Sequence, residues 1–407
     1  MKILVVSQYF PPEAVPIPFD VAQELSARGH AVRVLTGFPN YPSGEIFAGY
    51  RQGWRRREQI GKISVLRVPL YADHSQRLLR RVFNYLSFAA SSASARRFSR
   101  GADAVYVYAT QTTAAFGPWL WRMTGGPPYI LHIQDLWPDT VVGSDVAGAG
   151  RGARWMARLL SPWIRSVYRN AAAVVGIAPT MVETLKQRVP SARVSLVYNW
   201  AEETGARRED GVRGAQGRGA VVIYAGNVGE MQDLETVLRA AHSSADAGVQ
   251  LLIVGDGVAR PRLERLSEDL DCTNVRFEDP VSRDQVASLY ARADFGLVSL
   301  RDLRVFRGTI PSKLQSILAN GLPVVATAQG DVRFFVEQHR VGLTADAEDV
   351  AALADAFRRA ALMTEDEKRE MGGRAEAAYR DNFHRESGLS RLESVLSAAA
   401  QRNQEKQ

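Results

Sequence analysis

Short apolar runs alternate with amphipathic segments along the first half of the chain. The run at residues 3–6 is followed by a helical pattern at residues 19–28 and by a second apolar run at residues 32–36. Strands that alternate with helices in this way form parallel sheets that helices cover on both faces. Further strand-like runs at residues 103–108, 129–133, 172–178 and 194–198 extend the pattern. We therefore predict a doubly wound α/β domain over residues 1–200.

Residues 201–219 interrupt the alternation, because Glu, Arg, Gly, Gln and Asp replace nearly all apolar residues there. Such a segment cannot bury itself, so we expect an exposed linker. The alternation resumes with apolar runs at residues 221–224, 249–254, 274–277 and 294–299. A chain of 407 residues also suits two α/β domains of ordinary size. The second domain is expected at residues 220–380.

The strongest candidate chemistry lies in a loop, helix and strand at residues 305–330. Pro311 and Ser312 favour a helix start, and Gly321 with Pro323 ends the helix before an apolar strand. Lys313 is the only cation at this helix start. Because the first N–H groups of a helix are unpaired and its dipole is positive there, a neighbouring lysine makes a phosphate site. An ordinary α/β crossover with a surface lysine fits this segment equally well when it is considered alone.

A glycine-bearing turn opens the second predicted domain. Gly226, Asn227 and Gly229 follow the apolar run at residues 221–224 and precede a helical pattern. Glycine lets backbone N–H groups come close to a diphosphate. A single G-x-x-G is a weak signal, but its place at the opening of the second sheet, upstream of Lys313, strengthens it. The two segments together predict an anion site in this domain.

Polar and aromatic residues follow the strands of the first domain. Asp135 comes just after the run at residues 129–133, where a carboxylate can accept a hydroxyl proton or orient an acceptor. His132 points to the same side of this strand as Gln134, although a buried core histidine is the commoner interpretation. Exposed rings near strand ends suit stacking on a sugar, and packing of a long loop is the alternative. The candidates on this side are Glu13, Asn40, Tyr41, Gln134, Asp135 and Trp137.

Two arginine-rich segments indicate a membrane surface. The first runs from Arg77 to Phe98 and the second from Arg151 to Arg169, each with apolar and aromatic residues at helical spacing. Basic amphipathic helices lie in the headgroup region, where each cation near an anionic leaflet contributes about 1 kcal/mol. The alternative is that the apolar sides face the domain core. Pro162 is expected to begin a new helix and so to divide the second segment.

Composition limits the compartment and the chemistry. The net charge of +7 fits phosphate-rich partners or an anionic membrane. Cys272 stands alone, so no internal disulfide can form and a reducing cytoplasm is expected. The N-terminal apolar run is too short for a signal peptide, and no run approaches the roughly 20 residues that span a bilayer. No His, Cys or acidic cluster has the spacing of metal ligands. We expect a cytoplasmic protein that binds the inner leaflet peripherally.

These segments resemble the family 4 glycosyltransferases of the GT-B fold, especially the bacterial polysaccharide-assembly branch with its fucosamine and colanic-acid transferases. The resemblance rests on the sequence motifs at residues 9–13, 38–44, 135–138, 226–229 and 311–323. In the last of these, P-S-K is followed by a short helix and by A-x-G-x-P-V, as in the branch. The resemblance implies two Rossmann-like domains that face a central cleft. It also implies a C-terminal helix, residues 381–407, that crosses back to the first domain.

The chain departs from the wider family at several positions. Gly308 and Ser316 replace two glutamates, and Asn227 and Gln232 replace an arginine and a lysine. The branch shares the A-G-N-x-G turn with its later Gln. A serine hydroxyl can still hydrogen-bond a ribose diol, although as a shorter and neutral group. Lys313 must then compensate more of the donor's charge. Arginines that could add to it are Arg301, Arg304 and Arg307.

The resemblance implies a metal-independent, retaining transfer of a sugar from a nucleotide-diphosphate donor. UDP is the expected nucleotide, and an N-acetylated deoxyhexosamine is one candidate sugar. The implied acceptor is a lipid-linked glycan on polyprenyl diphosphate, held by the arginine-rich helices, and no nucleic-acid partner is expected. Asp135 and Lys313 are the implied catalytic residues, with Lys313 and helix dipoles stabilising the leaving diphosphate. The implied donor-binding residues are Gly226, Asn227, Gly229, Gln232, Asp279, Val281, Pro311, Ser312, Lys313 and Ser316.

Three other functions remain open. A GT-B nucleotide-sugar epimerase would share the architecture but would need several acids and histidines around the sugar. A non-catalytic GT-B scaffold would explain the missing glutamates and cations. A dinucleotide oxidoreductase is least favoured, because no G-x-G-x-x-G follows the first strand.

Overall fold

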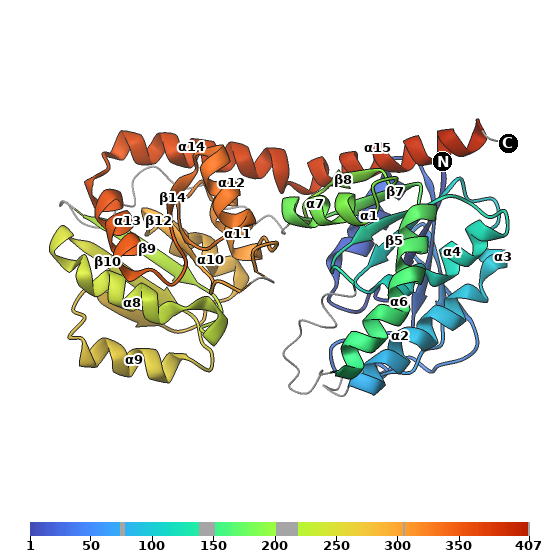
Figure 1. Ribbon diagram of the computed structural model, residues 1–407, viewed down its shortest axis with the longest axis horizontal. Coiled ribbons are helices and arrows are strands. Elements are labelled where there is room, and N and C mark those ends of the chain that lie inside the picture. Colours follow the sequence, from blue (N-terminus) through green and yellow to red (C-terminus); the bar gives the residue numbers. More distant parts are fainter. Residues whose placement is uncertain (74–77, 138–150, 201–218, 304–305, 406–407) are drawn as a thin grey trace. The chain divides into compact units, whose positions relative to one another are not determined.

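The computed structural model describes residues 1–73, 78–137, 151–200, 219–303 and 306–405. The chain divides into two compact units, Met1–Asn199 with Gly388–Gln407 and Trp200–Ser387. Each unit is built on one largely parallel sheet with helices packed on it (Figure 1). The predicted class, two α/β domains with parallel sheets, is therefore confirmed. Apart from Gly219, the expected linker at residues 201–219 lies outside the described residues.

The first sheet has the strand order β3-β4-β2-β1-β5-β6-β7-β8. Only β3 is antiparallel to its neighbour among the described pairs. The hairpin of β3 and β4 was not predicted, because β3 is an edge strand with polar residues. The strands are β1 (Lys2–Ser7), β2 (Ala31–Gly37), β3 (Arg56–Ile60), β4 (Ile63–Val68), β5 (Ala104–Ala109), β6 (Tyr129–Ile133), β7 (Ala173–Gly176) and β8 (Val194–Leu196).

Helices of the first unit follow the strand order. The chain moves from β1 to β2 in one direction and later from β4 to β5 in the other, so right-handed crossovers place α1 and α2 on opposite faces. Helix α1 begins earlier than predicted because Pro16 and Pro18 suit its first turn. These helices are α1 (Pro16–Ala27), α2 (Leu78–Ala93), α3 (Arg96–Ser99), α4 (Phe116–Met123), α6 (Arg151–Asn170) and α7 (Pro179–Arg188).

Helix α15 (Arg385–Gln404) ends the chain, and from Gly388 on it belongs to the first unit. The carboxylate of Glu393 accepts a hydrogen bond from Arg28 at 2.7 Å and lies 2.7 Å from Nε2 of His30. Both partners precede β2, so α15 lies near the edge where the strands begin.

Helix α6 is continuous, so the predicted division at Pro162 is wrong. Proline removes one N–H from the helical hydrogen-bond ladder. Ile164 and Val167, just beyond it, are buried, and the ring centroid of Trp163 lies 6.1 Å from that of Phe116 on α4. This packing offsets the lost hydrogen bond and keeps the helix whole.

The second sheet has the strand order β11-β10-β9-β12-β13-β14, and all its described pairs are parallel. The chain leaves β9 for β10 on one side and returns to β12 on the other. Ligands of such sheets bind at the carboxyl ends of the strands where the order reverses, which here is between β9 and β12. The strands are β9 (Ala220–Ala225), β10 (Val249–Val254), β11 (Val275–Glu278), β12 (Phe295–Ser299), β13 (Val324–Thr327) and β14 (Gly342–Ala345).

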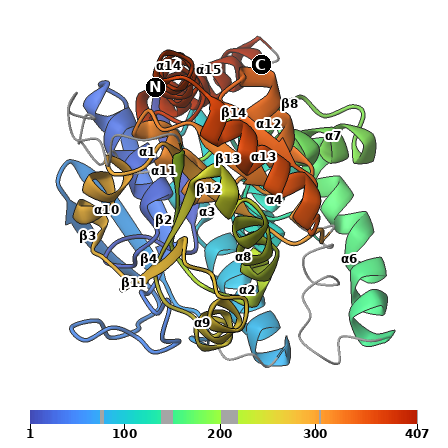
Figure 2. The same ribbon diagram turned by 90° about the vertical axis from the view of Figure 1, so that its left-hand side faces the viewer.

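Helices cover both faces of the second sheet. Apolar residues of α8, α9 and α13 share one core cluster with β9, β10 and β12, and α8 and α9 lie side by side (Figure 2). Helix α11 contacts β12 and β13, and α14 packs against it. The helices are α8 (Leu234–Ser243), α9 (Arg260–Asp269), α10 (Arg283–Tyr290), α11 (Ser312–Ala319), α12 (Asp331–His339), α13 (Val350–Leu362) and α14 (Glu365–Asn382).

Candidate functional site

The turn after β9 lies where the strand order of the second sheet reverses. Gly226 has a φ of +140°, which residues with a side chain rarely adopt, and its N–H donates to the Val254 carbonyl at 2.9 Å. A Cβ atom at this position would lie 3.3 Å from both Cε and Nζ of Lys313. The glycine therefore lets the lysine of α11 come against the backbone at the end of β9. Two residues predicted from separate segments meet here.

A second glycine turn, after β10, supports the first. Gly255 also has a φ of +140°, and a Cβ atom there would lie 2.0 Å from the Gly226 carbonyl oxygen. The Val228 N–H donates to the Asp256 carbonyl at 2.9 Å. The two turns thus pack backbone against backbone, which fixes the 226–229 turn. This role of Gly255 was not predicted, although a glycine directly after a buried strand was the available signal.

Neutral hydrogen bonds hold the rest of the turn. The Tyr224 phenol donates to the Asn227 carbonyl at 2.5 Å. The side-chain oxygen of Gln232 accepts from the Gly229 N–H at 3.1 Å and from the Asn227 amide at 3.4 Å. The Ser299 hydroxyl donates to the Gln232 carbonyl at 2.5 Å. Asn227 and Gln232, which replace basic residues of the wider family, therefore shape the loop and add no charge to it.

Lys313 lies in the first turn of α11. Part of its side chain reaches solvent, but Nζ is buried and has no hydrogen-bond partner among the described residues. Nζ lies 2.9 Å from the centroid of the Tyr224 ring. Burial holds the pKa of this amine well below its usual range. An anion that reached Nζ would supply the charge partner that the described residues do not provide.

The start of α11 presents further groups beside Lys313. Pro311 precedes the helix in an extended conformation, and no side chain caps the helix N-terminus at Ser312. Ser316 lies one turn after Lys313, so the two share a face. Burial raises the pKa of Tyr290 to about 12, and a hydrogen bond to the Ser316 hydroxyl opposes this rise. The serine that replaces a family glutamate is thus held by a buried phenol.

Asp279 and Val281 follow β11, the outer strand of the second sheet, and both are exposed. The Asp279 carboxylate lies 3.3 Å from Arg260. Because β10 separates β11 from β9, these residues lie about 10 Å along the same sheet edge from the Gly226 turn. They share the edge with the cluster of Gly226 and Lys313 but stand apart from it.

The arginines after β12 differ in their partners. Arg307 makes two hydrogen bonds to the Asp302 carboxylate, at 2.8 and 2.7 Å, so its charge is already compensated. The Nε of Arg301 is buried without a partner in the described chain, and its backbone N–H donates to the Met231 carbonyl at 3.1 Å. Arg304 lies outside the described residues. Of the three arginines, Arg301 therefore best fits the predicted role of adding positive charge to that of Lys313.

In the first unit, Glu13 is buried and ties two loops together. Its carboxylate accepts from the backbone N–H groups of Phe10, Asn40 and Tyr41, at 3.0, 2.8 and 2.9 Å. Burial raises the pKa of Glu13, and these N–H groups oppose the rise. Glu13 therefore positions the loops after β1 and β2.

The loop after β2 has one buried and one exposed candidate. Asn40 is fully buried, and its amide donates to the Phe38 carbonyl at 2.9 Å. The side chain of Tyr41 is 38% exposed, and its ring centroid lies 5.3 Å from that of Tyr9. Tyr41 is thus the residue of this pair that presents a ring to solvent.

Asp135 is exposed at the end of β6. Burial raises the pKa of Tyr108 well above its ordinary value, and the charge of nearby Asp135 adds to this rise. Gln134 accepts a hydrogen bond from the Asn199 amide at 2.7 Å. Of the two predicted candidates at this strand end, Asp135 is the one open to solvent.

His132 and Trp137 are both buried. His132 lies 2.7 Å from the Tyr106 phenol, and burial lowers its pKa to about 3. It therefore fits the interpretation of a core histidine. The Trp137 ring centroid lies 5.8 Å from that of Tyr85 on α2, so Trp137 packs against this helix.

The two arginine-rich helices differ in what they expose. On α2, Phe83 and Leu86 are 63% and 49% exposed and lie three residues apart, on one face. On α6, Leu159, Arg165 and Arg169 are exposed, whereas Trp163, Ile164 and Val167 pack into the unit. Arg77, and the α6 side chains before Arg158, lie outside the described residues. Helices in the described ranges are too short or too polar to cross a membrane.

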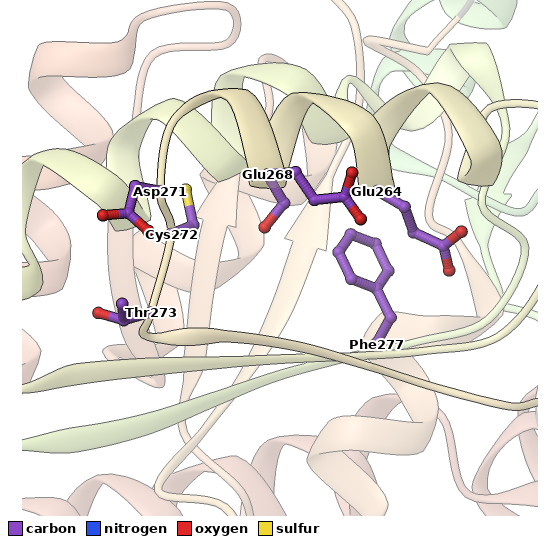
Figure 3. Close-up of a pocket in the computed structure, with 7 residues that line it drawn as sticks. Glu264, Glu268, Asp271, Cys272, Thr273 and Phe277 are labelled. Atoms are coloured by element: carbon purple, nitrogen blue, oxygen red, sulfur yellow. The ribbon is translucent and has the colours of Figure 1, made fainter.

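A shallow recess of ≈ 320 Å³ lies between α9 and β11 (Figure 3). Asp271 and Thr273 precede β11, so the recess lies toward the strand starts and away from Gly226. Its carboxylates would repel a diphosphate, so it does not fit an anion. Within the described part of the chain, no three His, Cys, Asp or Glu side chains are grouped to hold a metal ion. The lining residues are Glu264, Ser267, Glu268, Asp271, Cys272, Thr273 and Phe277.

Known protein families match both halves of the chain. Residues 19–200 match a glycosyl transferase 4-like domain, and residues 219–362 match the glycosyl transferases group 1. An Escherichia coli K12 protein, named as colanic acid biosynthesis glycosyl transferase WcaI, is 30% identical over 89% of this chain and 93% of its own.

Two further similar proteins have names or titles that mention a nucleotide. A GDP-mannose-dependent alpha-mannosyltransferase of Mycobacterium tuberculosis is 29% identical over 50% of this chain and 52% of its own. The structure of Anabaena HepE in complex with UDP superposes with a TM-score of 0.64, over 98% of this chain and 100% of that chain. Their sequence identity is 14%, so this match concerns the fold.

Proposed function

Because the chain belongs to the family 4 glycosyltransferases of the GT-B fold, we propose that it moves a sugar from a nucleotide-diphosphate donor to a glycan or lipid-linked acceptor in cell-surface polysaccharide assembly. The position of Lys313 is the observation that supports donor binding. Its buried amine lacks a partner in the described chain and lies against the Gly226 turn, at the end of β9. A diphosphate would complete this arrangement.

The proposed chemistry uses positive charge at the leaving group. Negative charge builds on the nucleoside diphosphate as the glycosidic bond to the sugar breaks. Lys313 Nζ, the uncapped N-terminus of α11 and the N–H groups of the Gly226 turn would stabilise this charge. These groups would take the role that a metal has in other transferases, so we propose transfer without a metal. Retention of configuration is proposed from the family resemblance.

On the acceptor side, Asp135 is the proposed orienting or basic group. It is exposed at the end of β6, whereas Glu13 and Asn40 are buried and support the neighbouring loops. Tyr41 presents a ring on which a sugar could stack. Asp135→Asn should therefore lower turnover with little effect on nucleotide affinity. Equal turnover in the variant and the wild type would remove Asp135 from the mechanism.

The nucleotide is proposed to be UDP. HepE has been solved with UDP, whereas the mycobacterial relative is named for GDP-mannose, so a panel of UDP, GDP and TDP decides. We expect one of them to raise the melting temperature of the wild type and of Lys62→Ala, in which an exposed lysine is removed. Lys313→Ala should weaken binding roughly 10- to 100-fold, since a hydrogen bond to a charged group contributes about 1.5–3 kcal/mol. An unchanged shift in Lys313→Ala would remove Lys313 from the site.

A peripheral membrane contact is proposed through α2. Phe83 and Leu86 are exposed on one face of this helix, and Arg80, which lies 3.4 Å from the Asp73 carboxylate, is exposed beside them. The Phe83→Ser and Leu86→Ser double variant should lose sedimentation with anionic phospholipid vesicles. Leu362→Ser, on α13, is the matched control, because Leu362 is 80% exposed on the other unit. Equal sedimentation of both variants would contradict docking through α2.

A non-catalytic scaffold is the second candidate. Asn227, Gln232 and Ser316 are neutral where the wider family has charged residues, and all are held by internal hydrogen bonds. A scaffold would bind the nucleotide sugar without consuming it. Incubation with nucleotide sugar and a membrane-derived acceptor separates the two, because only the enzyme releases nucleoside diphosphate.

A further inference from the structure

Tyr224 contacts two parts of the proposed donor site at once. This residue lies in β9 and is fully buried. The face of its ring lies under Nζ of Lys313, 2.9 Å from the centroid, and its phenol donates to the Asn227 carbonyl at 2.5 Å. One side chain thus links the lysine of α11 with the turn that follows β9.

We propose that Tyr224 is a positioning residue for donor binding, whose ring holds the Lys313 amine against Gly226 and whose phenol holds the adjoining turn. The proposal rests on the proposed function, because it assumes that this cluster receives the donor's diphosphate. It adds a residue that neither the sequence pattern nor the family resemblance singled out.

A ring suits this task better than a carboxylate. A lysine side chain has four rotatable bonds and considerable rotamer entropy, so an unpartnered Nζ would otherwise turn toward water. An aromatic face packs against the amine whether or not it is protonated, attracts the protonated form electrostatically, and leaves the N–H groups without an acceptor. A carboxylate would hold the amine equally well but would compete with the diphosphate for it. The ring therefore fixes the position of Nζ and leaves its N–H groups available to the diphosphate.

The neighbouring groups are neutral as well. On α10, the phenol of Tyr290 lies near Tyr224 and bonds Ser316, which shares the face of α11 with Lys313. Directly after β9, the neighbour is the Gly226 backbone. In the described chain, no carboxylate forms an ion pair with Lys313, and burial is the cause of its lowered pKa. A diphosphate would be the first charged partner that Nζ meets.

Two substitutions separate the functions of the ring and the phenol. Tyr224→Phe keeps the ring and loses the bond to Asn227, so we expect affinity for the bound nucleoside diphosphate to fall by at most about 5-fold. Tyr224→Leu loses both, so the affinity should fall by about 10-fold or more. Phe335→Leu is the matched control, because it replaces another buried ring of the same unit, on α12. This control should keep the wild-type affinity.

The second readout is the reactivity of Lys313 itself, which needs no nucleotide. Trace acetylation of the full chain at a series of pH values, quantified by mass spectrometry, gives the apparent pKa of this amine. We expect the wild type, Tyr224→Phe and Phe335→Leu to share a lowered value. In Tyr224→Leu, Nζ should turn into solvent, and its pKa should rise toward that of an ordinary lysine.

The two readouts distinguish failure of this inference from failure of the proposed function. If UDP, GDP and TDP all fail to bind the wild type, the proposed function fails. The acetylation profiles still test whether the Tyr224 ring positions the Lys313 amine. If a nucleotide binds and Tyr224→Leu matches Tyr224→Phe in both affinity and acetylation profile, the ring does not position the lysine. That result would overturn the inference.

Discussion

Replacing Gly226 with alanine perturbs the proposed donor turn at the residue that faces Lys313. Its φ of +140° is strained for alanine, which costs on the order of 1–3 kcal/mol. The new Cβ would also lie 3.3 Å from Cε and Nζ of Lys313. The flexible end of the lysine can move away at little energetic cost, but the movement takes Nζ out of the site. We therefore expect a modest loss of stability together with a loss of nucleotide binding.

Thermal unfolding with and without nucleotide measures both effects. For a unit the size of Trp200–Ser387, 1 kcal/mol shifts the melting temperature by about 2–4 °C, so the fall should be roughly 2–12 °C. Gly255→Ala should fall further, because its Cβ would lie 2.0 Å from the Gly226 carbonyl oxygen. Gly373→Ala, in α14, meets no atom within 4 Å and should not be destabilised. A Gly226→Ala variant with wild-type stability and nucleotide binding would refute this reasoning.

Further predictions concern protons and buried acceptors. Nucleotide binding should take up a proton, because burial holds the pKa of Lys313 low in the free protein and a bound diphosphate would raise it. Between those two pKa values the affinity for the nucleotide falls as pH rises, by at most about tenfold per pH unit. Calorimetry in buffers of different ionisation enthalpy detects the proton that is taken up. An affinity independent of pH would contradict proton uptake by Lys313. Glu13→Ala leaves three backbone N–H groups without their acceptor, so the free energy of unfolding from denaturant titration should fall by roughly 3 kcal/mol or more. Replacing the exposed Glu45 with alanine should change the free energy of unfolding little. A similar loss in the Glu13→Ala and Glu45→Ala variants would argue against the role of Glu13 as an acceptor for the two loops. The carboxyl pKa of Glu393 is lowered, first by its bond to His30, so it stabilises the fold above the ordinary carboxyl pKa and this contribution is lost as pH falls through the lowered value. Glu393→Gln should therefore lose less stability than the wild type between about pH 5 and pH 3, and equal acid sensitivity would contradict the contribution of this carboxylate.

Local patterns were enough to predict the elements of the proposed donor site. The apolar run before Gly226 and the helix start at Lys313 are each encoded within about a dozen neighbouring residues. Their meeting depends on the strand order, which brings β9 beside β12 although a long stretch of chain separates them. No local pattern contains that information. The resemblance to a known family predicted the pairing where periodicity could not.

Roles that depend on packing were harder to predict. Pro162 has the sequence pattern of a helix start, yet contacts of Trp163 with α4 keep α6 continuous. Glu13 was predicted as a candidate site residue of the first domain, but its carboxylate accepts hydrogen bonds from three backbone N–H groups of two loops. The apolar run that contains Tyr224 predicted only a buried strand. In each case the decisive contact comes from a segment distant in sequence.

The most direct test of the central claim is a crystal structure of the chain with the nucleoside diphosphate that raises its melting temperature most. We predict that the diphosphate oxygens lie within hydrogen-bond distance of Lys313 Nζ, beside the Gly226 turn and the start of α11. A diphosphate bound elsewhere on the chain, with Lys313 still on the Tyr224 ring, would contradict the account.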